Sequence, residues 1–106
     1  MSAWIWLGLA GVLEVVWAVA LKHSAGFTRA GATALFVVAG VASFVLLAQA
    51  LKTIPLGTGY AVWTGIGAVG TALYGILVLG EPTDALRMVS IVLIVAGIAG
   101  LKLAAA

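Results

Sequence analysis

Glu14 is the residue whose type and position most directly indicate chemistry. It lies inside an apolar run from residue 3 to residue 21, and it is the only acidic residue within such a run. On insertion scales, comparable charged residues cost about 2.5–3.5 kcal/mol at the centre of a membrane helix. A neutral carboxylic acid buried in a structural hydrogen bond is the alternative interpretation. We expect instead a functional carboxylate, because no structural role evidently requires an acid there.

Trp17 and Ser43 are the polar side chains that we expect close to Glu14. Trp17 follows Glu14 by three residues, which places both on one face of a helix. Its indole N–H is then a donor beside the carboxylate. Ser43 lies in the middle of the next apolar run, where its hydroxyl could face the pocket or bond to the carbonyl four residues earlier. We predict the pocket role and keep the local bond as the alternative.

An aromatic stripe in the third apolar run predicts a wall of the pocket. Tyr60, Trp63 and Gly67 recur at helical spacing, and Tyr74 extends the same face. Such a stripe is often only core packing or part of the aromatic belt at the membrane surface. Trp63 lies well inside its run, where a belt would not place it, so we predict a binding role.

A carboxylate with indole and phenol walls in an apolar setting is a candidate cation site. Burial disfavours the charged form of a carboxyl group, and a second copy of Glu14 in a dimer would add repulsion between like charges. A cation and a proton cannot occupy such a site together, so each displaces the other. The predicted chemistry is therefore exchange of a proton for a cation.

The elements that position these residues follow from the composition. The chain has 106 residues, of which 65% are hydrophobic and 8% are charged, and its mean hydropathy is +1.32. Soluble domains carry about 25% charged residues, and a chain this short could not bury so much apolar surface in one core. A spanning helix needs roughly 20 apolar residues, so four helices with short loops use nearly the whole chain. We predict an all-α membrane protein, a single domain over residues 1–106, with helices at about 3–21, 30–51, 55–79 and 84–103.

Polar and turn-forming residues separate the four runs. Residues 22–29 form the most polar loop, in which His23 is expected at the membrane surface. Pro55 suits the first turn of the third helix, where its missing N–H costs little. Thr83 or Asp84 can cap the fourth helix. Residues 3–21 could instead be a cleaved signal peptide, but no Lys or Arg precedes them, so we expect a retained helix.

The basic residues are divided almost evenly between the two sides of the membrane. Four spans place the first and third loops on one side, with Lys22, Arg29 and Arg87. The other side has Lys52 and Lys102. Lys and Arg near the spans set orientation, and a difference of one residue is nearly no bias. Two interpretations stay open: a weakly fixed orientation, or insertion in both orientations to give antiparallel dimers.

Small residues in the fourth run are candidates for dimer packing. Ser90 and Gly97 lie seven residues apart on one face, and small residues let membrane helices approach closely. Packing within one subunit is the alternative. Four short helices cannot enclose a path and also present two gates, so a dimer is the smallest plausible transporter. In an antiparallel dimer, exchange of the two subunits' conformations would give alternating access, as inverted repeats do in larger transporters.

The chain resembles the small multidrug resistance family over essentially its full length, and within it the guanidinium exporter subtype. The stretches that carry the resemblance are residues 14–18, 21–29, 43–44 and 55–67. The block from Tyr60 to Gly67 is specific to the family. Trp17 and Thr64 resemble the guanidinium exporters, whereas polyspecific drug exporters typically have a small residue and a serine there. Ser90 stands where a glycine is common.

The resemblance implies a proton-coupled antiporter in the inner membrane of a bacterium, acting as an antiparallel homodimer. It implies that Glu14 of both subunits binds either protons or the substrate, guanidinium or a small guanidinyl cation. It also implies which side chains hold the carboxylates and wall the site, namely Trp17, Ser43, Tyr60 and Trp63. Guanidinium agrees with this chemistry, since it is planar, stays charged and donates paired N–H groups that match a carboxylate. A polyspecific exporter of quaternary ammonium and other drug cations, with the same fold, is the alternative.

Other classes of protein are less favoured by the composition and motifs. The chain has no cysteine and one His, and its three acidic residues are spread out, so we predict no metal site and no cofactor. It lacks Ser/His, HExxH and phosphate-loop patterns, so we expect no enzyme, and a net charge of +2 is too small to suggest nucleic-acid binding. A proton-carrying ring subunit of a rotary ATPase is also small and built around one membrane carboxylate. Such subunits are usually helical hairpins, however, whereas this chain has four predicted spans.

Overall fold

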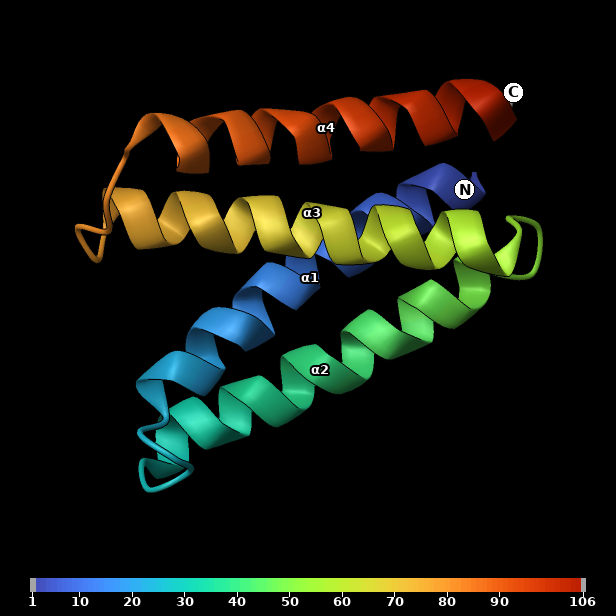
Figure 1. Cartoon of the computed structure of the whole chain (residues 1–106). Helices are drawn as coiled ribbons and strands as arrows, with labels where there is room; N and C mark the ends of the chain where they lie inside the picture. Colours follow the sequence, from blue (N-terminus) through green and yellow to red (C-terminus); the bar gives the residue numbers. More distant parts are fainter. Residues whose placement is uncertain (1, 106) are drawn as a thin grey trace.

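Four long helices make up the structure, a computed structural model that describes residues 2–105 (Figure 1). They are α1 (Ala3–His23), α2 (Ala30–Ala50), α3 (Leu56–Leu77) and α4 (Ala85–Ala105). Each is long and apolar enough to cross a membrane. The prediction of an all-α chain with four helices able to span a membrane is therefore confirmed, and the bounds differ from the predicted ones by two residues or fewer at each end.

Local hydrogen bonds determine where α1 begins and ends. Ser2 caps its first turn, because the Ser2 Oγ accepts a hydrogen bond from the N–H of Ile5 at 3.4 Å. The helix includes Lys22 and His23, since basic side chains are favourable in the last turn. His23 is thus the last residue of α1 rather than the loop residue that we expected. Ser24 follows, and both its N–H and its hydroxyl group donate hydrogen bonds to the carbonyl of Leu21, in the last turn of α1.

The residues that precede α3 and α4 differ slightly from the predicted caps. Pro55 is the N-cap residue of α3, one position before the first turn in which we placed it. Of the two candidates before α4, Asp84 forms the cap: its Oδ2 accepts from the N–H of Arg87 at 3.3 Å. Its Oδ1 also accepts from Arg87 Nη1 at 2.6 Å, and this hydrogen bond lowers the pKa of the Asp84 carboxyl from its ordinary 3.8.

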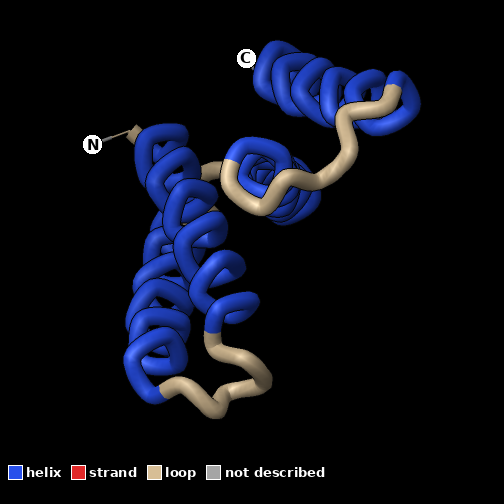
Figure 2. Tube along the Cα trace, turned by 90° about the vertical axis from the view of Figure 1, so that its left-hand side faces the viewer, coloured by secondary structure: helices blue, strands red, loops and turns tan. Residues whose placement is uncertain are grey.

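The helices form two hairpins that cross each other (Figures 1 and 2). α1 and α2 run antiparallel and side by side, and α4 packs along α3. α1 is the central element because it packs against both α2 and α3, while α2 meets α3 mainly near the turn that joins them. The buried core lies where these three helices converge, and it consists of Leu7, Ala10, Leu47, Ala50, Ile54, Val62 and Trp63.

Glycines make the crossing of α1 and α3 close. A Cβ atom added at Gly11 would overlap the side chain of Ile66, and one added at Gly70 would overlap Val15. Small residues at such crossings let membrane helices approach until their side chains interlock. The α1–α3 crossing therefore depends on glycines of both helices, and it lies beside Glu14.

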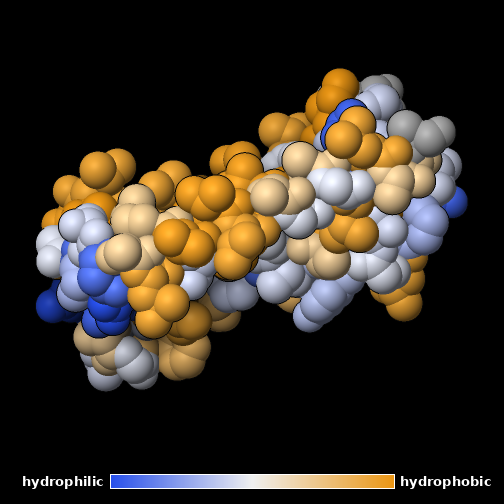
Figure 3. All heavy atoms as spheres, turned by 45° about the horizontal axis from the view of Figure 1, so that its top comes forward, coloured by the Kyte–Doolittle hydropathy of each residue, from blue (hydrophilic) through white to orange (hydrophobic). Residues whose placement is uncertain are grey.

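On the face that Figure 3 shows, hydrophobic residues predominate between the two ends of the molecule, and the most hydrophilic ones lie toward the ends. Large hydrophobic side chains are exposed on every helix, among them Val12, Val38, Leu73 and Leu86. Soluble proteins rarely expose continuous apolar surface of this extent. The surface suits lipid, which agrees with the composition.

α4 is the most exposed helix, with no buried residue between Ala85 and Ala105. Ser90 and Gly97 both lie on exposed surface. The Ser90 Oγ donates to the carbonyl of Leu86 in its own helix at 2.7 Å, and a Cβ atom at Gly97 would meet nothing within 4 Å. Neither residue is therefore buried within the single subunit. Their packing between subunits stays a prediction.

Candidate functional site

The side chain of Glu14 lies against the backbone of Gly67 where α1 crosses α3. Glu14 is half-buried and Gly67 is buried. A Cβ atom at Gly67 would overlap Oε1, Cδ and Cγ of Glu14, so the glycine provides the space that the carboxyl group occupies. Gly67 was noted in the sequence only as part of the aromatic stripe. Its position on the same face as Trp63 was the signal that could have assigned it this role.

Two buried polar atoms of α1 have no hydrogen-bond partner within residues 2–105. They are Oε1 of Glu14, an acceptor, and Nε1 of Trp17, a donor. Leaving a buried polar group unpaired costs about 1–3 kcal/mol. We expected the indole N–H beside the carboxylate, but in the single chain Trp17 packs edge-on against Phe36, with ring centroids 5.9 Å apart. α1 thus carries a buried acceptor and a buried donor whose hydrogen bonds are not made within residues 2–105.

Ser43 joins three helices through two hydrogen bonds. Its hydroxyl donates to the carbonyl of Ala10 in α1 at 2.7 Å and accepts from Nε1 of Trp63 in α3 at 3.0 Å. The bond to the carbonyl four residues earlier in α2, our alternative for Ser43, is therefore wrong. The Ala10 carbonyl lies one helical turn before Glu14. The bridge thus holds the part of α1 next to the carboxylate against α2 and α3. Residue types alone could not reveal this role, because the acceptor is the backbone carbonyl of Ala10.

Two aromatic side chains surround Trp63. The ring of Tyr60, one turn earlier in α3, lies 5.4 Å from that of Trp63 between centroids, and the ring of Phe44 in α2 lies 5.2 Å away. Trp63 is 4% exposed, whereas Tyr60 is 54% exposed. The structure therefore brings Ser43, Trp63 and Tyr60 together. Within the described chain, the Tyr60 hydroxyl makes no hydrogen bond, and Trp63 donates to Ser43 rather than to Glu14.

Tyr74, which we placed on the same stripe, has a different partner. Its hydroxyl lies 2.8 Å from Nε2 of His23, at the end of α1, and the two rings meet edge-on. The helical face is continuous, but α1 diverges from α3 beyond the crossing. Tyr74 therefore ties the far ends of these two helices together instead of lining the Glu14 site.

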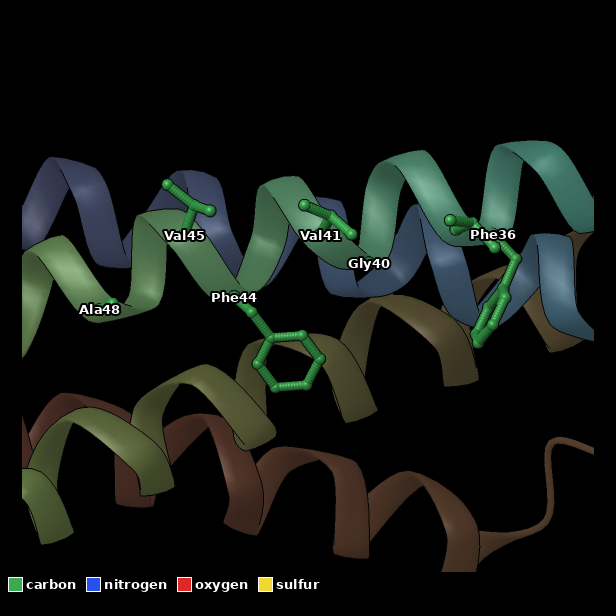
Figure 4. A pocket seen from close by; sticks show the side chains of 7 residues that line it. Phe36, Gly40, Val41, Phe44, Val45 and Ala48 are labelled. Carbon is green, nitrogen blue, oxygen red and sulfur yellow. The ribbon is translucent and has the colours of Figure 1, made fainter.

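An apolar groove lies on α2 beside the aromatic cluster (Figure 4). Its volume is about 520 Å³, and its lining includes Phe36, Gly40, Val41 and Phe44. The Phe44 ring points from α2 toward α3, where it contacts Trp63. The groove therefore adjoins the wall of the site and offers only apolar side chains to a ligand.

The arrangement suits a small cation that can donate hydrogen bonds. One carboxylate supplies the charge, and neighbouring indole, phenol and phenyl rings supply faces that attract cations. Among the residues that the structure describes, no cluster of three His, Cys, Asp or Glu could hold a metal ion. Fold and site together define a multi-pass membrane protein with one carboxylate inside a spanning helix.

Comparison with known proteins identifies the family. A family model described as Small Multidrug Resistance protein matches residues 2–94. The chain is 58% identical over 102 residues to a guanidinium exporter of Yersinia pestis, covering 96% of this chain and 98% of the relative. It is 55% identical over 101 residues to a guanidinium exporter of Escherichia coli, covering 95% and 96% respectively. The chain therefore belongs to the Small Multidrug Resistance family.

Proposed function

We propose that this protein exports guanidinium and small guanidinyl cations across the bacterial inner membrane in exchange for protons. The observation that carries the proposal is the Glu14 carboxyl group, which lies in a spanning helix with Oε1 buried and unpaired within residues 2–105. The high identity to proteins named guanidinium exporters supports the choice of substrate. Guanidinium stays charged at all physiological pH values, so it does not cross a bilayer unaided.

In this mechanism the proton and the cation compete for the same carboxylate. The ionised Glu14 side chain binds guanidinium through two parallel N–H···O hydrogen bonds, a geometry that the planar cation favours. Protonation of Glu14 removes the charge and one acceptor, so the cation leaves. Gly67 leaves room for the carboxyl group, and the Ser43 bridge holds α1 in register with α3. Trp17, Tyr60 and Trp63 wall the site.

The working unit that we propose is an antiparallel homodimer in which both Glu14 carboxylates face one cation. Lys22, Arg29 and Arg87 balance Lys52 and Lys102 across the membrane, which permits insertion in both orientations. The exposed face of α4 that carries Ser90 and Gly97 supplies the contact between subunits, since small residues allow close helix packing. Exchange of the two subunits' conformations then opens the site to alternate sides.

The apolar groove on α2 extends the proposal to substituted guanidinium ions. A ligand whose charged head binds Glu14 could place an apolar tail past Phe44 into this groove. The same groove is the observation that favours the second candidate function, export of quaternary ammonium and other drug cations. The two functions differ in the cation's head, because a quaternary ammonium has no N–H to donate to the carboxylate.

Transport by purified protein in liposomes tests the proposal. We expect guanidinium to evoke proton-coupled currents that a tetraalkylammonium does not. Glu14→Gln should abolish the currents while leaving a folded protein, because the amide can neither ionise nor exchange a proton. Asp84→Asn, a matched acid-to-amide change outside the spans, should keep them. A Glu14→Gln variant that still pumps against a gradient would refute the coupling, and currents from the tetraalkylammonium alone would favour the second function.

A further inference from the structure

A second pocket lies between α1 and the C-terminal half of α3, separate from the Glu14 site. Its volume is about 310 Å³, and its polar lining residues are Lys22, Thr71, Tyr74 and Glu81. Gly75 also lines it and lies eight residues after Gly67, about 12 Å further along α3. The pocket therefore contains one basic and one acidic side chain, neither of which takes part in the proposed binding of the cation or the proton.

The chain reversal after α3 holds Glu81 in place. Gly80 has a positive φ of 69°, which turns the chain back, and the N–H of Glu81 donates to the carbonyl of Gly75 at 3.0 Å. A Cβ atom at Gly75 would overlap the Glu81 carboxylate, which lies directly on this glycine. The acid is thus positioned by the backbone, much as Glu14 is positioned by Gly67.

Lys22 and Glu81 line the same pocket without forming an ion pair. Within residues 2–105 the one ion pair joins Arg87 to Asp84. Glu81 also lines a smaller hollow on its other side that includes Arg87, but Arg87 is already paired with Asp84. The pocket toward α1 therefore presents a separate positive and a separate negative group. A ligand with a single charge would be attracted by one of these two side chains and repelled by the other, which has the same sign of charge.

The two charged residues of the pocket lie at one end of the spans, where we expect the lipid headgroups. Lys22 is in the last turn of α1, and Glu81 follows the end of α3, so both are at the same end of the spans. Basic residues at helix ends place their charge at the membrane surface. The rest of the lining is small or apolar, including Ala68, Ala72 and Leu79.

We propose that this pocket binds the headgroup of a zwitterionic aminophospholipid. The lipid phosphate accepts from Lys22, and the primary ammonium donates to Glu81, with the Thr71 hydroxyl as a neutral partner. A choline headgroup would lack the N–H donor for Glu81. An anionic headgroup would bind Lys22 but would be repelled by the carboxylate. Selectivity for the primary amine therefore depends on Glu81, and affinity for the phosphate depends on Lys22.

Native mass spectrometry of the purified protein with equimolar phosphatidylethanolamine, phosphatidylcholine and phosphatidylglycerol tests the proposal. We expect the protein to retain about tenfold more of the ethanolamine lipid than of either other lipid, because one charge-assisted hydrogen bond, from the lipid ammonium to Glu81, has about this effect on affinity. Glu81→Gln should remove this preference but keep binding to phosphate. Lys22→Gln should lower retention of all three lipids. Lys52→Gln, a basic residue at the opposite end of the spans, is the control and should behave as the wild type.

Gly75→Ala tests the same site without changing a charge. The new Cβ displaces the Glu81 carboxylate, so the preference for the ethanolamine lipid should fall as it does in Glu81→Gln. Gly100→Ala is the control, because a Cβ there meets nothing within 4 Å. Equal retention of the three lipids, no retained lipid at all, or a preference unchanged in Glu81→Gln would overturn the proposal. The Glu81 variant decides the matter even if Gly75→Ala fails to fold.

Discussion

The hydrogen-bonded bridge at Ser43 allows the most direct test of the structure. Ser43→Ala removes the bond to the Ala10 carbonyl and leaves Nε1 of Trp63 without its acceptor. Both Ser43, at 0% exposure, and Trp63, at 4%, are shielded from solvent, so water cannot replace the lost partner. The substitution therefore weakens contacts of α2 with both α1 and α3 at once.

The size of the effect follows from the two lost bonds. Hydrogen bonds between side chains of membrane helices contribute about 0.6 kcal/mol on average and at most about 1.7. A buried donor left unpaired costs about 1–3 kcal/mol, and the methyl group of alanine fills only part of the space. We expect Ser43→Ala to lower the free energy of unfolding by about 1–2 kcal/mol.

Ser90→Ala is the matched control in α4. Ser90 is also in a spanning helix, but its hydroxyl bonds only to the carbonyl of Leu86 in the same helix and it is exposed. Its removal should change stability by less than about 0.5 kcal/mol. Unfolding of both variants by sodium dodecyl sulfate in mixed micelles, followed by circular dichroism, measures the difference.

A double-mutant cycle with Trp63→Phe isolates the Ser43–Trp63 bond. The phenyl ring keeps most of the packing but has no N–H, so adding Ser43→Ala to it should cost less than Ser43→Ala alone. We expect a coupling energy of about 0.5–1.5 kcal/mol. If Ser43→Ala is as stable as Ser90→Ala, or if the coupling energy is zero, the bridge does not join the helices and the reasoning is wrong.

Three further predictions concern the position of the carboxylate, the start of α4 and the orientation of the chain. Gly67→Ala places a Cβ where the Glu14 carboxyl lies. Overpacking of this kind costs about 1–3 kcal/mol, so the guanidinium-driven current should fall about tenfold. Gly31→Ala should leave the current unchanged, because a Cβ there meets nothing within 4 Å, and equal currents from the two variants would contradict the placement of Glu14. Because Arg87 lowers the pKa of Asp84 in the folded protein, the pair contributes stability above the ordinary value of 3.8 and loses it as the pH falls through the lowered pKa. Thermal unfolding should therefore show a larger loss of stability at acid pH for the wild type than for Asp84→Asn, and parallel curves would be evidence against the pair. Two lysines added after the C-terminus should fix one orientation and reduce transport in cells. Labelling of a single cysteine introduced into this cysteine-free chain measures the orientation. Undiminished transport by a fully oriented protein would exclude the antiparallel dimer.

Much of the fold could be predicted because membrane insertion is local. Each run of apolar residues forms a helix on its own, since a backbone in lipid must bond within the segment. Hydropathy alone does not specify the helix ends: Lys22 and His23 continue α1 because basic residues suit the last turn. The choice of Asp84 over Thr83 as the cap depended on Arg87, which binds both carboxylate oxygens.

The candidate site was predicted by residue type but not by contacts. Glu14 was evident because a carboxyl group in an apolar run is costly. Helical spacing placed Trp17 on the face of Glu14 and Tyr74 on the face of Trp63. In the structure, however, Tyr74 bonds to His23, and the Trp17 N–H has no hydrogen-bond partner within residues 2–105. Spacing specifies a face of one helix only. The partner on that face depends on how two helices cross.

By itself, the sequence determined that this is a four-span membrane protein with one carboxyl group inside its spans. These properties follow from hydropathy and from the cost of a charge in lipid, which each segment sets independently. Only the tertiary structure decided that Glu14 lies on Gly67, that Ser43 connects Ala10 with Trp63, and that α4 has no buried residue. The physical reason is that lipid is as apolar as a helix surface, so helix partners are chosen by close packing and hydrogen bonds rather than by hydrophobicity. Those contacts exist only once the helices have met.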